Sequence, residues 1–300
     1  MFVIKYRTFF FWLTGLLLAL AIAALLVIPP ELSIDFTGGS LIEVAYPGAH
    51  PSIDELEKSL APLSLGEVSL RESGQDGVVL RSRTLTPDEH VAVLAALSGT
   101  ASTTELRYTA IGPSMSSELS VKALYAITGV ILMIVLYIAF AFRKVSKPVP
   151  SWGYGLAVVA MLAIDIIVPA GFYAIYAKAT GAQADILFVV ALLALLGYCV
   201  NDVIVIFDRI REHLRRNEER NVREEFEVTI GKSIDETMGR SINTALTVVL
   251  ALLAIIFFGP EATRNFALVI LVGVVAGTFS SICRSAPLLI PLAAWFSRKK

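Results

Sequence analysis

Two aspartates lie within long apolar stretches of the chain, and they are the residues best suited to chemistry. Asp202 follows Asn201 and lies four residues after Tyr198, on the same face of a helix. It precedes Asp208 by six residues, which is about 9 Å at the rise of an α-helix. The second aspartate, Asp165, could face a wet cavity or a neighbouring helix. A charge inside a membrane costs about 2.5–3.5 kcal/mol on insertion scales, so both are functional candidates, and a carboxyl there can exchange a proton.

Polar side chains on two later apolar stretches could surround Asp202. One stretch begins at Arg240 and is polar along one helical face, and the other ends at Arg284 and has small residues that let helices approach closely. Burial raises the pKa of a carboxyl and a nearby arginine lowers it, so cycling such a pair takes up and releases a proton. One alternative stays open, namely a static cluster of polar groups that only fixes helix packing. For Arg284 we favour extension of the side chain to the nearer interface. The two stripes are Arg240, Asn243, Thr244 and Thr247, and Gly273, Gly277, Ser280 and Arg284.

Other kinds of chemistry find no support in the sequence. The three histidines are scattered, and we find no nucleotide-binding glycine loop, nucleophile triad or metal-ligand spacing, so we expect no enzymatic activity, cofactor or metal. The basic residues alternate with glutamates and leave no basic patch for nucleic acid. Both cysteines, Cys199 and Cys283, fall in apolar stretches, where we expect them to be small packing residues.

The composition calls for a membrane. Hydrophobic residues make up 56% of the 300 and charged residues only 17%, against about 25% in an ordinary soluble domain. Because about 20 apolar residues cross a bilayer core, six stretches predict six transmembrane helices. The first exceeds the apolar region of a signal peptide and lacks a small-residue cleavage site, so we expect a retained anchor. The stretches are residues 8–30, 123–142, about 148–177, about 186–207, 241–260 and 265–283.

The distribution of basic residues predicts the orientation. Lysines and arginines concentrate at the N-terminus, at 143–147, in 208–240 and in the C-terminal tail, whereas two short loops on the other side hold only Lys178 and Arg264. Cytoplasmic loops carry the excess of Lys and Arg, so we expect both termini inside and residues 31–120 outside the cytoplasm of a bacterial inner membrane. The predicted domains are residues 1–30 with helix 1, an outer domain at 31–120, and helices 2–6 within 121–300.

The outer segment has the sequence pattern of a soluble α+β domain. Strands are predicted at 40–46, 67–71, 78–83 and 105–111, the middle two joined by the turn 73–77. Helices are predicted at 53–60, after a Ser52 cap with Glu55 three residues on, and from Thr86-Pro87 to Gly99. The order β-α-β-β-α-β is typical of a small ferredoxin-like sandwich. The fold class expected is therefore a multi-pass α-helical membrane protein with a ferredoxin-like domain between helices 1 and 2.

The charged stretch 208–240 has a helical pattern of its own. Apolar residues recur every four positions, which indicates an amphipathic helix on the membrane surface. The alternative is a solvent-exposed helical linker that is rich in charged residues of both signs. The apolar positions are Phe226, Ile230, Ile234 and Met238.

Several motifs are specific, and together they cover the chain in order. Residues 34–40, Ile-Asp-Phe-Thr-Gly-Gly-Ser, follow helix 1 directly, and residues 197–212 begin Gly-Tyr-Cys-Val-Asn-Asp. Helix 5 opens with 240–247, Arg-Ser-Ile-Asn-Thr-Ala-Leu-Thr, and helix 6 carries 277–282, Gly-Thr-Phe-Ser-Ser-Ile. These segments resemble the SecF branch of the SecD/SecF family of protein-export membrane proteins, within the resistance-nodulation-division superfamily. The chain departs at Cys283-Arg284, where the family usually has an aromatic-apolar pair, and at Ile164-Asp165, where it often has His-Asp.

The resemblance implies an accessory subunit of the Sec translocase that uses the proton gradient to promote late steps of protein export. It implies SecD as the complementary six-helix half, since transporters of this class are built from two similar bundles. It also implies the SecYEG channel and a translocating preprotein as partners, and adds YidC as a candidate. Asp202 would carry the proton and Arg240 would be its membrane partner. Two other functions stay open, namely an independent proton-driven exporter of lipids or small solutes and a structural scaffold of the translocon.

The motif after helix 1 allows two interpretations. Its glycines can adopt the positive φ that a turn from a membrane helix into a strand requires, and we favour this structural role. The alternative is direct contact with a translocating chain. The motif residues are Asp35, Phe36, Thr37, Gly38 and Gly39.

Overall fold

The computed structural model describes residues 2–48, 51–73, 76–99, 102–142 and 148–298. The chain forms two compact units, which we call the helix unit and the α+β unit. The helix unit comprises residues 1–30, 125–182 and 187–300, and the α+β unit comprises residues 31–124 and 183–186. The predicted turn residues Gly74 and Gln75 lie outside the described residues. So do the basic residues Arg143, Lys144, Lys147, Lys299 and Lys300 that contributed to the expected orientation.

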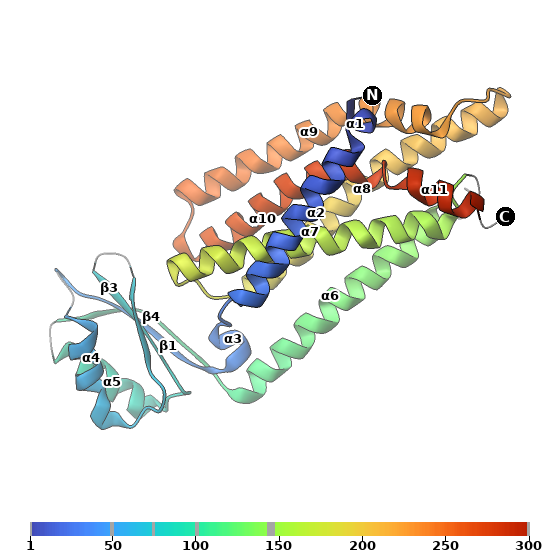
Figure 1. The fold of residues 1–300 in the computed structure, drawn as a ribbon. Coiled ribbons are helices and arrows are strands. Elements are labelled where there is room, and N and C mark those ends of the chain that lie inside the picture. The colour runs from blue at the N-terminus through green and yellow to red at the C-terminus, as the bar shows by residue number, and fades with distance from the viewer. Residues whose placement is uncertain (1, 49–50, 74–75, 100–101, 143–147, 299–300) are drawn as a thin grey trace. The chain divides into compact units, whose positions relative to one another are not determined.

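Long apolar helices dominate the chain, as predicted (Figure 1). Within the described residues, six helical stretches are long and apolar enough to cross a membrane, and each overlaps one of the six predicted spans, several extending well beyond it. The second, α6, starts within the α+β unit and continues into the helix unit. The helices are α1 Phe2–Lys5, α2 Arg7–Val27, α6 Pro113–Ala141, α7 Ser151–Thr180, α8 Ile186–Glu219, α9 Phe226–Phe258, α10 Glu261–Ser280, the π-helix η2 Ser281–Ser285, and α11 Leu289–Arg298.

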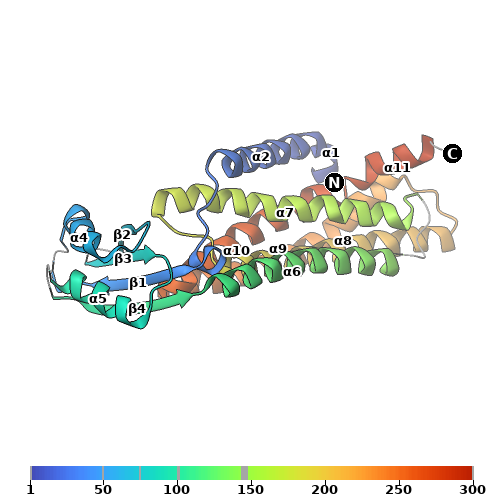
Figure 2. The same cartoon turned by 90° about the horizontal axis from the view of Figure 1, so that it is seen from below.

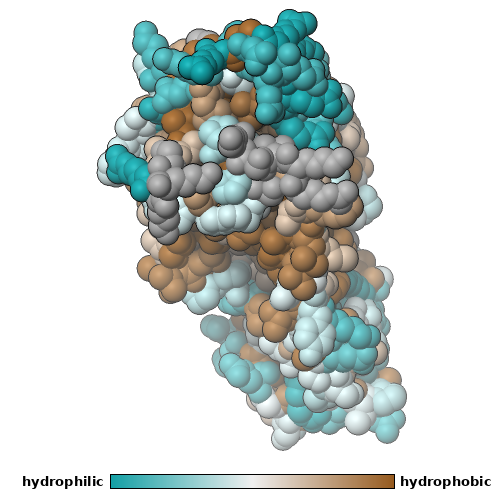
Figure 3. All heavy atoms as spheres, turned by 90° about the vertical axis from the view of Figure 1, so that its right-hand side faces the viewer, coloured by the Kyte–Doolittle hydropathy of each residue, from teal (hydrophilic) through white to brown (hydrophobic). Residues whose placement is uncertain are grey.

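The stretch 208–240 differs from the expected surface helix. Helix α8 continues to Glu219 and α9 already begins at Phe226, so the amphipathic residues form the first turns of α9. Ile230 and Ile234 are fully buried in the core of the helix unit. The periodic apolar face therefore packs against other helices instead of lying on a membrane surface. On the face shown in Figure 3, hydrophilic side chains gather over the connection between α8 and α9.

The core of the helix unit is built from apolar residues of α6, α7, α8 and the C-terminal helices. Phe142 stacks on Tyr154 with ring centroids 5.2 Å apart, and Phe207 meets both rings edge-on. Helices α2 and α7 are in close contact at Gly171. A Cβ atom added there would lie 2.6 Å from the Cα atom of Ala21, which real Cβ atoms do not tolerate. Gly171 is thus required by the packing of two helices.

We expect Gly171→Ala to destabilise the helix unit by about 1–3 kcal/mol, the usual cost of overpacking a well-packed interior. The added methyl meets the backbone of α2, which cannot rotate away as a side chain could. Gly155→Ala is the matched control, because it lies in the same helix and has nothing within 4 Å of its added Cβ. Thermal unfolding of the detergent-solubilised chain should separate the two variants. Equal midpoints would contradict the close approach of α2 and α7.

The α+β unit contains a four-stranded antiparallel sheet of order β2-β3-β1-β4. The strands are β1 Gly39–Ala45, β2 Ser69–Ser73, β3 Gly77–Ser82 and β4 Thr104–Ile111. Helices α4 Ile53–Leu60 and α5 Pro87–Ser98 cover one face, as Figures 1 and 2 show, and the 3₁₀ turn Ala61–Leu63 follows α4. This confirms the predicted β-α-β-β-α-β order, and each boundary moves by no more than about two residues.

Local chemistry explains why these helices begin where they do. The side chains of Ser52 and Thr86 each accept a hydrogen bond from the backbone N–H of the residue three positions on. In return, the side chains of Glu55 and Glu89 accept a hydrogen bond from the backbone N–H of the cap residue. These are capping boxes, which satisfy amide groups that the first helical turn leaves free. Glu89 also pairs with Arg83, whose hydrogen bond is the main reason that the pKa of Glu89 falls to about 2. Buried Ile42, Val44, Val78 and Leu80 of the sheet pack with Leu56, Leu60, Val93 and Leu97 of the helices.

Candidate functional site

Asp202 lies inside the helix unit and receives hydrogen bonds from two other elements. Its side chain is buried, with 9% of its surface exposed. Ser241 Oγ of α9 donates to one carboxylate oxygen and Ser281 Oγ of η2 donates to the other. A buried carboxylate is costly unless hydrogen-bonded, and hydroxyl donors from two neighbouring elements supply that stabilisation. The site therefore joins α8, α9 and the last transmembrane segment.

The two serines reach Asp202 for identifiable reasons. Ser241 continues the buried stripe of α9, since Ile230, Ile234, Thr237 and Ser241 follow one another at intervals of three or four residues. Ser281 is the first residue of the π-helix η2, all five residues of which are buried. A π-helix carries one extra residue per turn and occurs often at functional sites. The π-helix thus sets which face of this segment meets Asp202.

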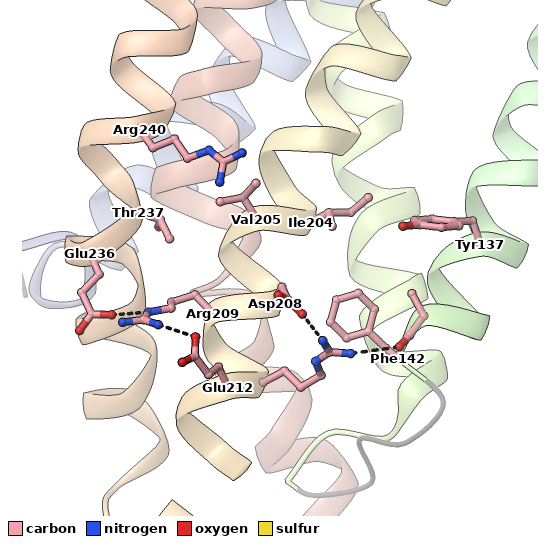
Figure 4. Close-up of a pocket in the computed structure, with 12 residues that line it drawn as sticks. Tyr137, Phe142, Ile204, Val205, Asp208, Arg209, Glu212, Glu236, Thr237 and Arg240 are labelled. Carbon is pink, nitrogen blue, oxygen red and sulfur yellow. Dashed lines mark hydrogen bonds and ion pairs between the residues drawn. The ribbon is translucent and has the colours of Figure 1, made fainter. Parts of the chain in front are cut away.

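A small hollow of about 120 Å³ opens beside the Asp202 carboxylate. Arg240 lines this hollow and also a larger one of about 630 Å³, and Val205 lies in both. Figure 4 shows the Arg240 side chain extending from α9 toward Val205 on α8. The guanidinium of Arg240 and the carboxylate of Asp202 therefore line the same small hollow. The small hollow is lined by Tyr198, Asn201, Asp202, Val205, Arg240 and Thr244.

The other charged groups of the larger hollow are already paired (Figure 4). Arg209 bonds both Glu212 and Glu236, and Arg211 pairs with Asp208. Arg240, in contrast, makes no ion pair within 4.0 Å among the residues that the structure describes. Its charge is therefore available to a carboxylate that shares its hollow.

Asp165 and Arg284 lie buried in the same helix unit. Asp165 is 2% exposed, and its Oδ1 atom has no hydrogen-bond partner within the described part of the chain. It faces α10, where an added Cβ on Gly277 would lie 4.0 Å from its Cγ atom. Arg284 is 8% exposed, and its Nε and Nη1 atoms also lack a described partner. Asp165 thus faces a neighbouring helix, which was one of the two predicted environments. Arg284 is buried, whereas we expected its side chain to extend to the membrane interface.

The structure brings together only part of the predicted polar cluster. Tyr198, Asn201, Arg240 and Thr244 share the hollow with Asp202, and Tyr198 lies 3.4 Å from the hydroxyl of Thr278. Asn243 and Thr247 are exposed on α9 and do not line the hollow. Of the small residues of α10, Gly273 packs on Leu195 and Gly277 on Cys199, which confirms the close approach of α10 and α8. Sequence reasoning missed Ser241 and Ser281. The apolar repeat through Ile230 and Ile234, continued at helical spacing, leads to Ser241.

The motif after helix 1 forms a sharp turn, as its glycines predicted. Ile34–Thr37 form the short helix α3, which Ser33 caps, and Gly38 and Gly39 follow with φ of 73° and 125°. An added Cβ at Gly39 would lie 2.5 Å from the carbonyl oxygen of Ser82 on the neighbouring strand β3. Only glycine fits both the backbone angle and the space at this position. Both glycines thus have the positive φ that the predicted turn requires.

Gly39→Ala should destabilise the α+β unit more than Gly48→Ala. Both glycines have φ of 125°, but an added Cβ at Gly48 has nothing within 4 Å. Both variants carry the backbone strain of a positive φ, of the order of 1–2 kcal/mol, while Gly39→Ala adds a clash with the backbone of β3. Amide exchange in β1 of the full chain, measured by mass spectrometry, reports the difference. Equal exchange in the two variants would show that the clash relaxes without cost.

These features define a class: a multi-pass membrane protein with a polar site among its helices and a small α+β unit inserted after the first span. A family model described as "Protein export membrane protein SecD/SecF, C-terminal" matches residues 92–295, and one for the "SecD/SecF GG Motif" matches residues 23–46. The chain therefore belongs to the SecD/SecF family of bacterial inner-membrane proteins.

Individual relatives agree with this assignment. The chain is 34% identical to the protein translocase subunit SecF of Thermobaculum terrenum, over 96% of this chain and 92% of that relative. It is 33% identical to the SecF subunit of Anaerolinea thermophila, over 98% and 96%. The crystal structure of SecDF, a translocon-associated membrane protein from Thermus thermophilus, matches 98% of this chain with a TM-score of 0.82 and 28% identity. This chain spans only 38% of that SecDF chain.

Proposed function

We propose that this protein is an accessory subunit of the Sec protein translocase that uses the proton gradient to promote late steps of protein export. The observation that carries the proposal is a buried carboxylate, Asp202, which shares a polar hollow with an arginine that has no described ion pair. The family and the SecF names of its relatives support the role in export.

The geometry suggests how a proton would be handled. With Arg240 close, the charged form of a carboxylate is favoured, and with Arg240 withdrawn, burial favours the protonated form. Ser241 and Ser281 stabilise the charged form by donating to both oxygens, and a hydroxyl can also accept from a protonated acid. Since the three groups belong to α8, α9 and η2, a change in protonation alters the bonds that hold these elements together. Proton transfer would thereby be coupled to helix movement.

The family and the SecDF neighbour support the first of the proposed partners. The SecDF chain that this protein resembles carries a SecD part as well as a SecF part in its name, and we propose SecD as the complementary half. The SecYEG channel, YidC and the translocating preprotein are further proposed partners. Both termini would be cytoplasmic and residues 31–120 outside. In support, Arg7 at the start of α2 pairs with Glu227 at the start of α9 at 2.6 Å, which places the N-terminus beside the charged α8–α9 connection.

Two other functions would make different use of the same structure. An independent exporter of lipids or small solutes predicts an outer domain with a substrate cleft, whereas this α+β unit is a small sandwich with a filled core. A structural scaffold of the translocon would need no proton on Asp202. The deciding experiment is export of a preprotein into inverted membrane vesicles that carry Asp202→Asn, with and without a proton gradient.

A further inference from the structure

Asp35 makes a hydrogen bond that its place in a glycine-rich turn does not require. Its Oδ2 atom accepts from the backbone N–H of Ile186 at 2.9 Å, and Ile186 is the first residue of α8. The first N–H groups of a helix have no partner within the helix, and an aspartate oxygen is among the best acceptors for them. Asp35 thus caps a helix that begins about 150 residues later in the chain.

The cap is one of several hydrogen bonds between residues 31–35 and residues 183–186. We call these two bonded segments the connector. The N–H of Ala184 donates to the carbonyl of Glu31 at 2.8 Å, and the N–H of Ser33 donates to the carbonyl of Ala184 at 2.9 Å. Leu32 and Ala184 accordingly form a parallel β-bridge. Together these bonds give the loop before α8 a fixed place on the segment that enters β1.

Two arginines fasten the connector to the sheet. Arg81 of β3 donates to the carbonyl of Leu32 at 3.0 Å and to the hydroxyl of Thr37. Arg71 of β2 pairs with Glu31 at 2.5 Å, and its hydrogen bond is the main reason that the pKa of Glu31 is lowered. Glu31 is therefore charged at neutral pH and holds the ion pair. Strands β2 and β3 and the start of α8 thus share one hydrogen-bonded network.

We propose that Asp35 is a positioning residue: with the connector it fixes the first turn of α8 to the sheet, so that displacement of the sheet is delivered to the helix that carries Asp202. Helix α8 runs without a break from Ile186 to Glu219, and Asp202 lies 16 residues along it. A helix transmits displacement along its axis because its backbone hydrogen bonds run parallel to that axis. The inference rests on the proposed function in one respect only, namely that Asp202 carries the proton.

The cap can be tested directly by amide exchange of the full chain in lipid nanodiscs. In Asp35→Ala we expect the amides of residues 190–193 to exchange about fivefold faster, the factor that corresponds to loss of a typical cap. In Asp35→Asn, which keeps an acceptor oxygen, exchange should stay within about twofold of the parent protein. Asp54→Ala, at an acidic position in the first turn of α4, is a control for loss of charge. Unchanged exchange in Asp35→Ala, or equal effects of Ala and Asn, would overturn the cap.

A disulfide that replaces the lost hydrogen bond tests whether displacement of the sheet reaches Asp202 through the connector. Leu32 and Ala184 are bridge partners, and the strand spacing of about 4.8 Å lies within the range of a disulfide. We expect Asp35→Ala to lower gradient-dependent export at least threefold, and the added pair Leu32→Cys and Ala184→Cys to restore it when oxidised. Reduction should abolish the rescue. If Asp35→Ala does not accumulate, recovery of its level by the disulfide supports the proposal, and no recovery overturns it.

The outcomes separate this inference from the proposed function. Full export by Asp202→Asn would refute proton coupling whatever Asp35 does. Loss of export in Asp202→Asn together with full export in Asp35→Ala would refute only the transmission. Lowered export that the oxidised disulfide does not restore would also refute it, because a second fastening of the same segments should then replace the first.

Discussion

Asp202→Asn is expected to reduce gradient-dependent export to the level seen without a gradient, while the protein still inserts and assembles. Asparagine keeps the size of the side chain and one acceptor oxygen, so one of the bonds from Ser241 and Ser281 survives. It cannot take up and release a proton in the physiological range, and the step that couples protonation to helix position is lost. Export of a preprotein into inverted vesicles, measured with and without a proton gradient, gives the result.

The matched control is Asp208→Asn. Asp208 lies on the same helix and pairs with Arg211, but it is exposed. Because exposed ion pairs contribute only about 0–1 kcal/mol, this variant should export at nearly the parent rate. Parent-level export by Asp202→Asn would eliminate the coupling role and leave the scaffold function as the better account.

Arg240→Gln is expected to cause a loss of similar size. Glutamine retains hydrogen-bonding capacity but removes the charge that favours an ionised carboxylate in the shared hollow. Arg209→Gln is the control, because Arg209 lines the same larger hollow yet is held by Glu212 and Glu236. Measured in the same vesicles, Arg240→Lys should recover part of the activity, since it restores the charge without the planar guanidinium.

Arg284 provides the competing explanation. It is buried in η2, near the serine that binds Asp202, and its Nε and Nη1 atoms lack a described partner. If Arg284→Gln abolished gradient-dependent export and Arg240→Gln did not, the counter-charge of Asp202 would come from the last transmembrane segment instead of α9.

Elements governed by local rules were predictable from the sequence. The apolar runs identified the spans because a bilayer imposes both length and composition, and the Ser52 and Thr86 boxes identified helix starts because capping involves neighbouring residues. The β-α-β-β-α-β order of the α+β unit was predictable from the alternation, turns and caps of its segments. Asp202 stood out because an acid among apolar residues is rare.

Features that depend on tertiary contacts were not predictable in this way. The four-residue repeat from Phe226 is compatible with a membrane-surface helix or a solvated linker, because periodicity reveals an apolar face but not what covers it, and in the structure other helices cover it. Thr247 shares a helical face with Arg240 and yet lies outside the hollow, while Ser281 enters the site through a π-helix that regular spacing does not anticipate. The bond from Ile186 to Asp35 joins residues 151 positions apart, which no local pattern encodes.

The π-helix has a consequence for how this family member can change. One residue of Ser281–Ser285 is surplus to an ordinary helical turn. Removing a single residue there would let the segment close into regular α-helix while the residues after it keep nearly the same orientation relative to α10, because the wider π turn is what absorbs the extra residue. A one-residue deletion in Ser281–Ser285 should therefore disturb the packing of α11 less than the same deletion within α10, where no surplus residue is present to lose.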